Sequence, residues 1–426
     1  MLSLPILPML AAAEGGASVT AIFLQLAALI AAARLGGAIA KRVGQPTVLG
    51  ELLAGILIGP SLLGLADPND PFVHLLAELG VVILLFQIGL HTDLTSLLRV
   101  GPAAGAVGAV GVVLPFALGY GAAHLFGLDT IPALVCGAAL TATSIGISAR
   151  ILGDLKMLET IEGKTVLGAA VLDDVVGLVI LAVVATMAGG GAVTAGSIAT
   201  TVGAAVGFLI IAIALGNVVA PKLFHLIDRL PVRGTTAALA LAFALALAAL
   251  ADLVGSAMII GAFAAGLILH RTPQRERIED ATTTLGHFFV PVFFASVGAA
   301  VELSAMVDPT ALMLGGILLA IGVAGKFVAG YAPFWVPMRK AIVGAAMVPR
   351  GEVGLIFARM GLATGALNPE LFGGLMIMVI GTTVITPPWL AWLAGSSRAE
   401  MTAMGRTAQP QDIGTVDDLV MGERDG

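Results

Sequence analysis

The chain is a series of apolar stretches, each about as long as a helix that crosses a bilayer. Such a helix needs roughly 20 consecutive apolar residues, and windows of this kind, separated by Pro, Gly and charged residues, recur from residue 17 to residue 395. The pattern predicts an all-α polytopic membrane protein with thirteen transmembrane helices in a membrane domain over 1–395. The predicted spans are 17–40, 47–65, 72–92, 101–126, 130–152, 163–188, 195–220, 233–251, 253–270, 282–300, 310–331, 338–363 and 370–395.

Composition agrees with this pattern and excludes several classes of protein. Of the 426 residues, 58% are hydrophobic and only 11% are charged, whereas about a quarter of the residues in soluble domains are charged. The formal net charge of −6 gives no indication of a nucleic-acid partner. The bilayer is therefore the partner that composition indicates. The polar segment 396–426 is predicted to be a short, disordered cytoplasmic tail.

The distribution of Lys and Arg predicts the orientation of the chain. If the N-terminus lies outside, the inner loops receive 17 of the 21 basic residues and the outer loops receive none. Positive charge accumulates on the cytoplasmic side of membrane proteins. The prediction is a multi-pass protein of the cell inner membrane with a cytoplasmic C-terminus, although an organellar membrane would fit the same topology. The inner bases are Lys41, Arg42, Arg99, Arg150, Lys156, Lys164, Lys222, Arg229, Arg233, Arg271, Arg275, Arg277, Arg339, Lys340, Arg398, Arg406 and Arg424.

Three ionisable residues fall deep inside predicted spans. Asp173 and Asp174 lie in the middle of GAAVLDDVVGLVI, and Lys326 lies within AIGVAGKFVAG. An ionisable residue at membrane depth costs at least about 2.5 kcal/mol on insertion scales, so it usually has a partner or a function. We therefore take these three residues as the candidate functional site.

The adjacency of the two acids indicates what this site does. Neighbouring side chains on a helix point about 100° apart, so one aspartate can face a partner helix while the other faces a cavity. Two carboxylates this close do not both ionise readily at low dielectric, and a nearby lysine couples to their titration. Ionised carboxylates also bind small hard cations. The pattern predicts proton-coupled cation exchange, with Asp173 and Asp174 binding the ions, no cofactor and no enzymatic activity.

Two predicted helices carry interruptions. The first, LTATSIGISAR, places hydroxyl side chains at mid-span, and such groups can satisfy backbone atoms where a membrane helix unwinds. The second is the sequence Pro349-Arg350-Gly351. The two spans are seven helices apart, so they run in opposite directions. An inverted repeat of helices two to six against nine to thirteen follows, and discontinuous helices in such repeats indicate a transport site at the midplane.

Two further sets of charged residues have two readings. Arg350 and Glu352 lie at mid-span, where they either stabilise the break or take part in function. Glu51 lies near the start of its helix, where structural packing is at least as good an explanation.

Four motifs together resemble the bacterial cation:proton antiporter-2 family. They are GELLAGILIGPSLLG, TATSIGISARILGDL, VLDDVVGL and VPRGEVGLIFA. The resemblance covers 17–395 and is closest to NapA-type sodium/proton antiporters, with Kef-type potassium/proton proteins as relatives. It implies a homodimer with the NhaA/NapA-like fold. Core helices would lie at about 101–188 and 310–395, and dimerisation helices at about 17–92 and 195–300.

The resemblance also implies roles for individual residues. Asp174 matches the ion-binding carboxylate, and Asp173 matches the neighbour that pairs with the core lysine, here Lys326. Thr143 and Ser144 match the polar crossover of the first broken helix. Glu352 and Arg350 match a supporting charged pair near the second crossover. The Asp-Asp form with a lysine implies electrogenic exchange.

The predicted function is exchange of Na⁺ (or Li⁺) for protons by alternating access, which serves pH homeostasis. A K⁺/H⁺ antiporter of the same fold is the alternative. A passive cation channel is disfavoured because an acid–lysine cluster would block a pore. An intramembrane aspartyl protease needs two aspartates that face each other from separate helices. Kef-type proteins carry a nucleotide-binding regulatory domain, and segment 396–426 is too short to hold one.

Overall fold

The computed structural model describes residues 19–188, 194–227 and 235–403, and these ranges are helical apart from their connections. The helices of the first half are α2 (Val19–Arg42), α3 (Thr47–Ile58), α4 (Pro71–His91), α5 (Leu94–Arg99), α6 (Gly101–Leu125), α7 (Thr130–Ala139), α8 (Ile145–Asp154) and α9 (Ile161–Ala188). Those of the second half are α10 (Ala195–Ile227), α11 (Thr235–Leu253), α12 (Met258–His270), α13 (Arg275–Ala299), η1 (Leu303–Met306), α14 (Pro309–Ala329), α15 (Lys340–Ala346), α16 (Glu352–Ala363) and α17 (Pro369–Ala403).

The described helices confirm the predicted class, an all-helical membrane protein. Eight of them are long and apolar enough to cross a membrane. Shorter apolar helices stand at Thr47–Ile58, Thr130–Ala139, Met258–His270 and Val353–Leu362. Each of these lies in a stretch where the sequence predicts a span.

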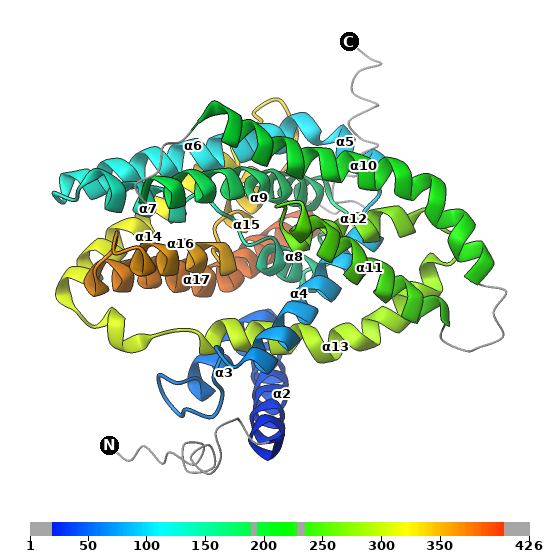
Figure 1. Ribbon diagram of the computed structural model, residues 1–426, viewed down its shortest axis with the longest axis horizontal. Coiled ribbons are helices and arrows are strands. Elements are labelled where there is room, and N and C mark those ends of the chain that lie inside the picture. The colour runs from blue at the N-terminus through cyan, green and yellow to red at the C-terminus, as the bar shows by residue number, and fades with distance from the viewer. Residues whose placement is uncertain (1–18, 189–193, 228–234, 404–426) are drawn as a thin grey trace.

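The helices pack in two bundles. The crossover bundle consists of α6–α9 and α14–α17, and the flanking bundle consists of α2–α4 and α11–α13 (Figure 1). Helix α10 contacts α9 on one side and α11 and α12 on the other. Buried apolar residues of α4, α8 and α13 belong to one hydrophobic cluster, so the two bundles meet around α8.

Both predicted interruptions are present. Residues 140–144 separate α7 from α8, and residues 347–351 separate α15 from α16. The two breaks meet in space, because the backbone N–H of Ser144 donates a hydrogen bond to the carbonyl oxygen of Pro349 over 2.9 Å. Four half-helices therefore end at one point inside the crossover bundle.

Some boundaries differ from the predicted ones. Helix α5 was not predicted, since its six residues are too few to form an apolar window. Helix α17 continues to Ala403, past the predicted end of the last span at 395; residues 404–426 of the predicted tail lie outside the described residues. Between α11 and α12, Gly255 has a φ of +79°, and the N–H of Ser256 donates to the carbonyl of Ala251. This turn ends α11, because a left-handed residue stops a helix and glycine adopts that conformation without strain.

Glycine allows the helices of the flanking bundle to approach closely. A Cβ atom on Gly36 of α2 would lie within 3 Å of the backbone oxygen of Gly50 in α3. The same holds for Gly89 of α4 against the backbone of α12, where Gly266 lies opposite. Small residues at such crossings bring helix backbones together in a membrane, where no hydrophobic force drives helices together.

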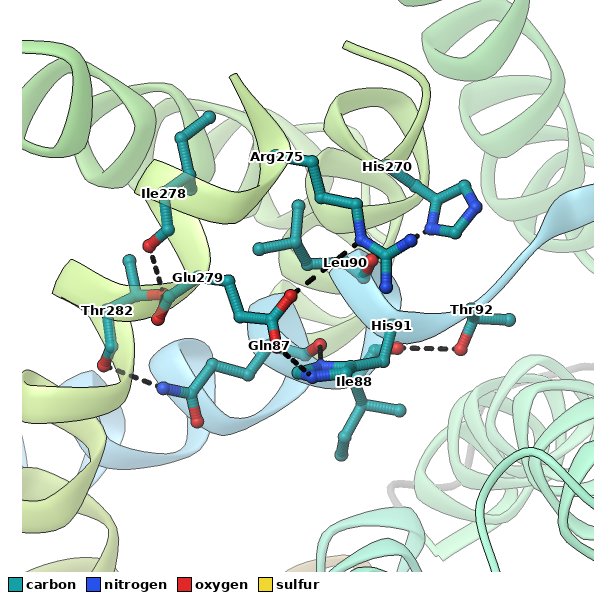
Figure 2. Close-up of polar contacts among 10 residues, drawn as sticks. All are labelled: Gln87, Ile88, Leu90, His91, Thr92, His270, Arg275, Ile278, Glu279 and Thr282. Atoms are coloured by element: carbon teal, nitrogen blue, oxygen red, sulfur yellow. Dashed lines mark hydrogen bonds and ion pairs between the residues drawn. The ribbon is translucent and has the colours of Figure 1, made fainter. Parts of the chain in front are cut away.

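A polar cluster ties the ends of three helices in this bundle (Figure 2). His91 of α4 contacts Glu279 of α13 over 2.8 Å, and Arg275 lies 3.8 Å from the same carboxylate. His270 at the end of α12 is 2.9 Å from the carbonyl oxygen of Leu90. Since α4 and α12 end here and α13 begins here, the cluster joins the ends of three helices.

Candidate functional site at the helix crossover

The direct ion pair at the crossover joins Asp173 and Lys326. Asp173 comes from α9 and Lys326 from α14, and the distance from Nζ to Oδ2 is 2.5 Å. The hydroxyl of Thr143, in the break between α7 and α8, donates to the same carboxylate oxygen over 2.8 Å. All three side chains are at most 1% exposed. The predicted pairing of Asp173 with Lys326 is therefore present.

The two adjacent aspartates have different surroundings. Asp173 holds Lys326 directly, and its second oxygen, Oδ1, is buried without a hydrogen-bond partner. Asp174 is 5% exposed and interacts electrostatically with Lys326 from the next position on α9. This arrangement agrees with the 100° separation of neighbouring side chains on a helix.

Hydroxyl groups of the first broken helix bind backbone carbonyls where α15 ends. The Thr143 hydroxyl, whose one proton is shared with Asp173, also lies 3.1 Å from the carbonyl oxygen of Met347, and the hydroxyl of Ser148 donates to Ala346 over 2.7 Å. Ser144 caps the start of α8 through its side chain. A Cβ atom on Gly351 would clash with the Ser144 side chain, so the crossing needs glycine there. Thr143 and Ser144, both predicted site residues, thus lie at the crossing of the broken helices.

Arg350 donates hydrogen bonds to backbone carbonyls at the crossover. It is fully buried, and its Nη2 donates to the carbonyl of Leu140, the C-cap of α7, over 2.6 Å. Its Nη1 donates to the carbonyls of Val348 at 2.6 Å and Gly322 at 3.2 Å. The C-terminal end of a helix carries partial negative charge and unpaired carbonyls. Arg350 therefore supports the crossover. Glu352, its predicted partner, has a side chain that lies outside the described part of the structure.

Three residues near the site were not predicted. Gly108 and Gly111 of α6 face the ion pair: a Cβ atom on Gly108 would lie 3.6 Å from Asp173 Oδ1, and one on Gly111 would lie 3.4 Å from Lys326 Nζ. Thr383 of α17 donates to the carbonyl oxygen of Arg350. The chain has 55 glycines, so no glycine stands out in the sequence as part of a site.

Glu51 belongs to a separate polar network, between the two bundles. Its carboxylate lies on α3, is 1% exposed and is 3.7 Å from Nη2 of Arg150 on α8. The same nitrogen donates to the hydroxyl of Thr47 over 3.1 Å. Asp154 accepts from both the N–H (3.0 Å) and the hydroxyl (2.8 Å) of Thr47. Of the two readings of Glu51, these contacts favour the structural one.

Comparison with known proteins identifies the family. Residues 27–394 match the family model described as sodium/hydrogen exchanger, transmembrane. The chain belongs to this family. The resemblance carried by the four motifs is confirmed, and the family is one of transporters, not of enzymes.

Three antiporters of similar length are among the relatives of this family member. The high-affinity Na⁺/H⁺ antiporter NhaS3 of Synechocystis is 39% identical over 89% of this chain and 91% of its own length. The Na⁺/H⁺-K⁺ antiporter GerN of Bacillus cereus is 35% identical over 89% of this chain and 98% of its own. A Na⁺/H⁺ antiporter of Enterococcus hirae is 30% identical over 85% and 95%.

The fold of this exchanger is also found in a solved structure. The sodium proton antiporter MjNhaP1 from Methanocaldococcus jannaschii superposes with a TM-score of 0.66, covering 88% of this chain and 99% of that one. The sequence identity is 17%, so this match bears on the fold alone. It shows that this chain has the fold of that antiporter.

Proposed function

We propose that this protein, a Na⁺/H⁺ antiporter of the exchanger family, binds Na⁺ and protons alternately at Asp174. Asp173 is held in an ion pair with Lys326, which leaves the neighbouring carboxylate as the acid for the transported ion. A carboxylate suits both cargoes, because it accepts a proton and is a hard oxygen ligand for Na⁺. The contact that carries the proposal is the 2.5 Å ion pair between Asp173 and Lys326, because it gives the two aspartates different roles.

Burial of the site requires alternating access. Asp173 and Asp174 are only 1% and 5% exposed. Neither carboxylate can exchange ions with water in this conformation. Transport therefore needs a second arrangement of the protein that opens the crossover, and movement of the crossover bundle past the flanking bundle supplies one. The crossover bundle is then the core domain, and the flanking bundle together with α10 is the dimerisation domain.

The polar network around Arg150 is proposed to keep the two bundles together on the side of the molecule that carries Arg150 and Lys340, and so to close the ion site to that side. It joins α8 of the crossover bundle to α3 of the flanking bundle through Glu51, Thr47 and Asp154. Opening toward that side has to separate the two helices and break these contacts.

Replacing Arg150 by glutamine is accordingly expected to favour opening on that side. Hydrogen bonds to charged groups contribute about 1.5–3 kcal/mol each, so deuterium uptake over residues 47–51 and 150–154 should rise about tenfold or more. Hydrogen–deuterium exchange measured by mass spectrometry checks this. Arg42→Gln is the matched control, because Arg42 is an exposed base on the same face, at the end of α2. Unchanged uptake in Arg150→Gln would contradict the proposed closure.

The number of membrane crossings and the inverted repeats are also proposed. The chain would cross the membrane thirteen times, with α7–α8 and α15–α16 each making one interrupted crossing and with inverted repeats around them. Opposed interruptions that meet at one point support such repeats. The side that carries Arg150, Lys340 and the end of α17 would be cytoplasmic by the positive-inside rule.

A homodimer is proposed as the functional unit. Apolar side chains on the outer faces of α2 and α10 support it, because Leu35, Ile39, Ile211 and Leu215 are each at least 59% exposed. A groove between α2 and α3 has an almost entirely apolar lining, in which Ala and Gly alternate with Leu, Ile and Val. A single-protomer mass in native mass spectrometry from lipid nanodiscs would overturn the proposal.

The experiment that tests the function is a cation screen in proteoliposomes. Na⁺ should drive proton flux, and its half-saturating concentration should rise as pH falls, because protons and Na⁺ compete for one carboxylate. Li⁺, K⁺ and Rb⁺ complete the screen. The name of GerN makes K⁺ the second candidate cargo. Flux that depends on voltage would support electrogenic exchange, and cation flux that is insensitive to a pH gradient would overturn antiport.

A further inference from the structure

A cavity opens on the side of the crossover bundle that carries Arg150 and Lys340, away from the ion site. Its volume is about 720 Å³. It is lined by the connection between α14 and α15, from Tyr331 to Arg339, by the first residues of α15 and by Leu393 of α17. This connection joins the helix that carries Lys326 to the second broken helix. None of the contacts at Asp173 or Arg350 uses these residues.

The cavity carries positive charge. Lys340 lines it, and its Nζ donates to the carbonyl of Phe334 over 3.1 Å. No carboxylate lies within 4 Å of that nitrogen among the described residues. Arg339 also lines the cavity and is held by Glu162, through its backbone N–H at 2.9 Å and its Nε at 3.3 Å. Nη2 of Arg339 is buried without a hydrogen-bond partner. Lys340 therefore lacks an anionic partner among the described residues, whereas the Arg339 guanidinium is paired with Glu162.

Aromatic side chains surround this charge and face outward. Phe334 is 78% exposed, Trp335 is 52% exposed and Tyr331 is 46% exposed. Trp and Tyr gather at the membrane–water interface, at the level of the lipid headgroups. Basic side chains at the same level attract anionic lipids. The cavity thus offers cationic donors to a headgroup and apolar surface to the acyl chains below it.

We propose that this cavity binds the phosphate group of an anionic phospholipid. The phosphodiester would accept from Lys340 Nζ, and the acyl chains would lie against the aromatic side chains and Leu393. A bound lipid would fix the connection between α14 and α15 and so stabilise both helices that build the crossover. Soluble phosphate could satisfy the same donors, but only a lipid would also cover the exposed aromatic rings. The site depends on the proposed orientation of the chain and is independent of the role of Asp174.

Lipid binding to the full-length protein tests this site. Native mass spectrometry in detergent, with dioleoyl phosphatidylglycerol added, should show a bound lipid that Lys340→Gln weakens by about tenfold, because charge-assisted hydrogen bonds to phosphate are strong. Lys340→Arg keeps the charge and should keep the binding. Arg42→Gln removes a base from the same face outside the cavity and should bind the lipid as the wild type does.

Three results would overturn the proposal. The first is undiminished binding of phosphatidylglycerol by Lys340→Gln. The second is equal binding of phosphatidylcholine, which has no net charge. The third is displacement of the lipid by millimolar inorganic phosphate, which would assign the cavity to a soluble phosphate. Thermal unfolding of Lys340→Gln without lipid shows whether the variant folds, and a folded variant makes the first comparison decisive.

Discussion

Replacing Asp174 by asparagine is expected to abolish Na⁺-driven proton flux and to leave the fold intact. Asparagine has the shape of aspartate but neither binds nor releases a proton, so it cannot alternate between the two cargoes. The ion pair at the crossover is formed by Asp173 and Lys326, so it should survive the substitution. Flux in proteoliposomes should fall to the leak of protein-free vesicles, and the melting temperature should stay within a few degrees of the wild type.

Asp129→Asn is the matched control for this experiment. Asp129 precedes α7, and its side chain makes no capping hydrogen bond, so the substitution removes an acid without touching the crossover. It should transport at the wild-type rate. If Asp174→Asn also exchanged Na⁺ for H⁺ at the wild-type rate, the assignment of the ion-binding carboxylate would be wrong. If it failed to fold, as judged by its melting curve, Asp174 would have a structural role instead.

The residues of the ion site could be predicted because charge is so rare in the spans. Asp173, Asp174 and Lys326 stand alone among apolar neighbours, and the energetic cost of a buried charge makes each of them a candidate. The pairing of Asp173 with Lys326 followed from the family resemblance and from the need of a buried lysine for a partner. The two helix breaks were predictable for a similar reason, since proline, glycine and clustered hydroxyls interrupt an apolar helix visibly.

Contacts to backbone carbonyls could not be predicted in this way. Arg350 reaches the carbonyl of Leu140, which lies 210 positions away along the chain. Every residue has a carbonyl group, so nothing in the sequence distinguishes Leu140 or Gly322 as an acceptor. Glu352 was the expected partner because the family resemblance matches the two residues to a charged pair, and its side chain lies outside the described part of the structure. The direction of a side chain at a crossing depends on how four half-helices meet, and that is a property of the tertiary structure.

The polar network of Arg150, Asp154 and Glu51, which links the two bundles, could not be predicted for a related reason. Arg150 and Asp154 lie near a predicted helix end, where charged residues are common and usually face water. Glu51 also lies close to a helix end, on a different span. Their association depends on which helix of one bundle faces which helix of the other. Sequence periodicity describes one helix at a time, so it contains no information about that choice.

Lys326 and Asp173 are expected to be strongly coupled in stability. Breaking a buried ion pair by removing one partner costs about 3–5 kcal/mol, because the other charge stays buried and unpaired. Lys326→Gln would leave Oδ2 of Asp173 with the Thr143 hydroxyl as its remaining donor. Asp173→Asn would leave a lysine that is 0% exposed without its direct counter-charge. Each single variant should therefore melt well below the wild type.

The double variant distinguishes a pair from two separate residues. With both charges removed, no unpaired ion stays buried, so its loss of stability should be smaller than the sum of the single losses by about 1–3 kcal/mol. Melting in detergent and in lipid measures all four proteins, and Thr382→Val controls for the loss of a buried polar group on α17 that bonds within its own helix. Additive losses would show that Asp173 and Lys326 act independently. The division of work between the two aspartates would then have no support, because it rests on Asp173 being committed to this lysine.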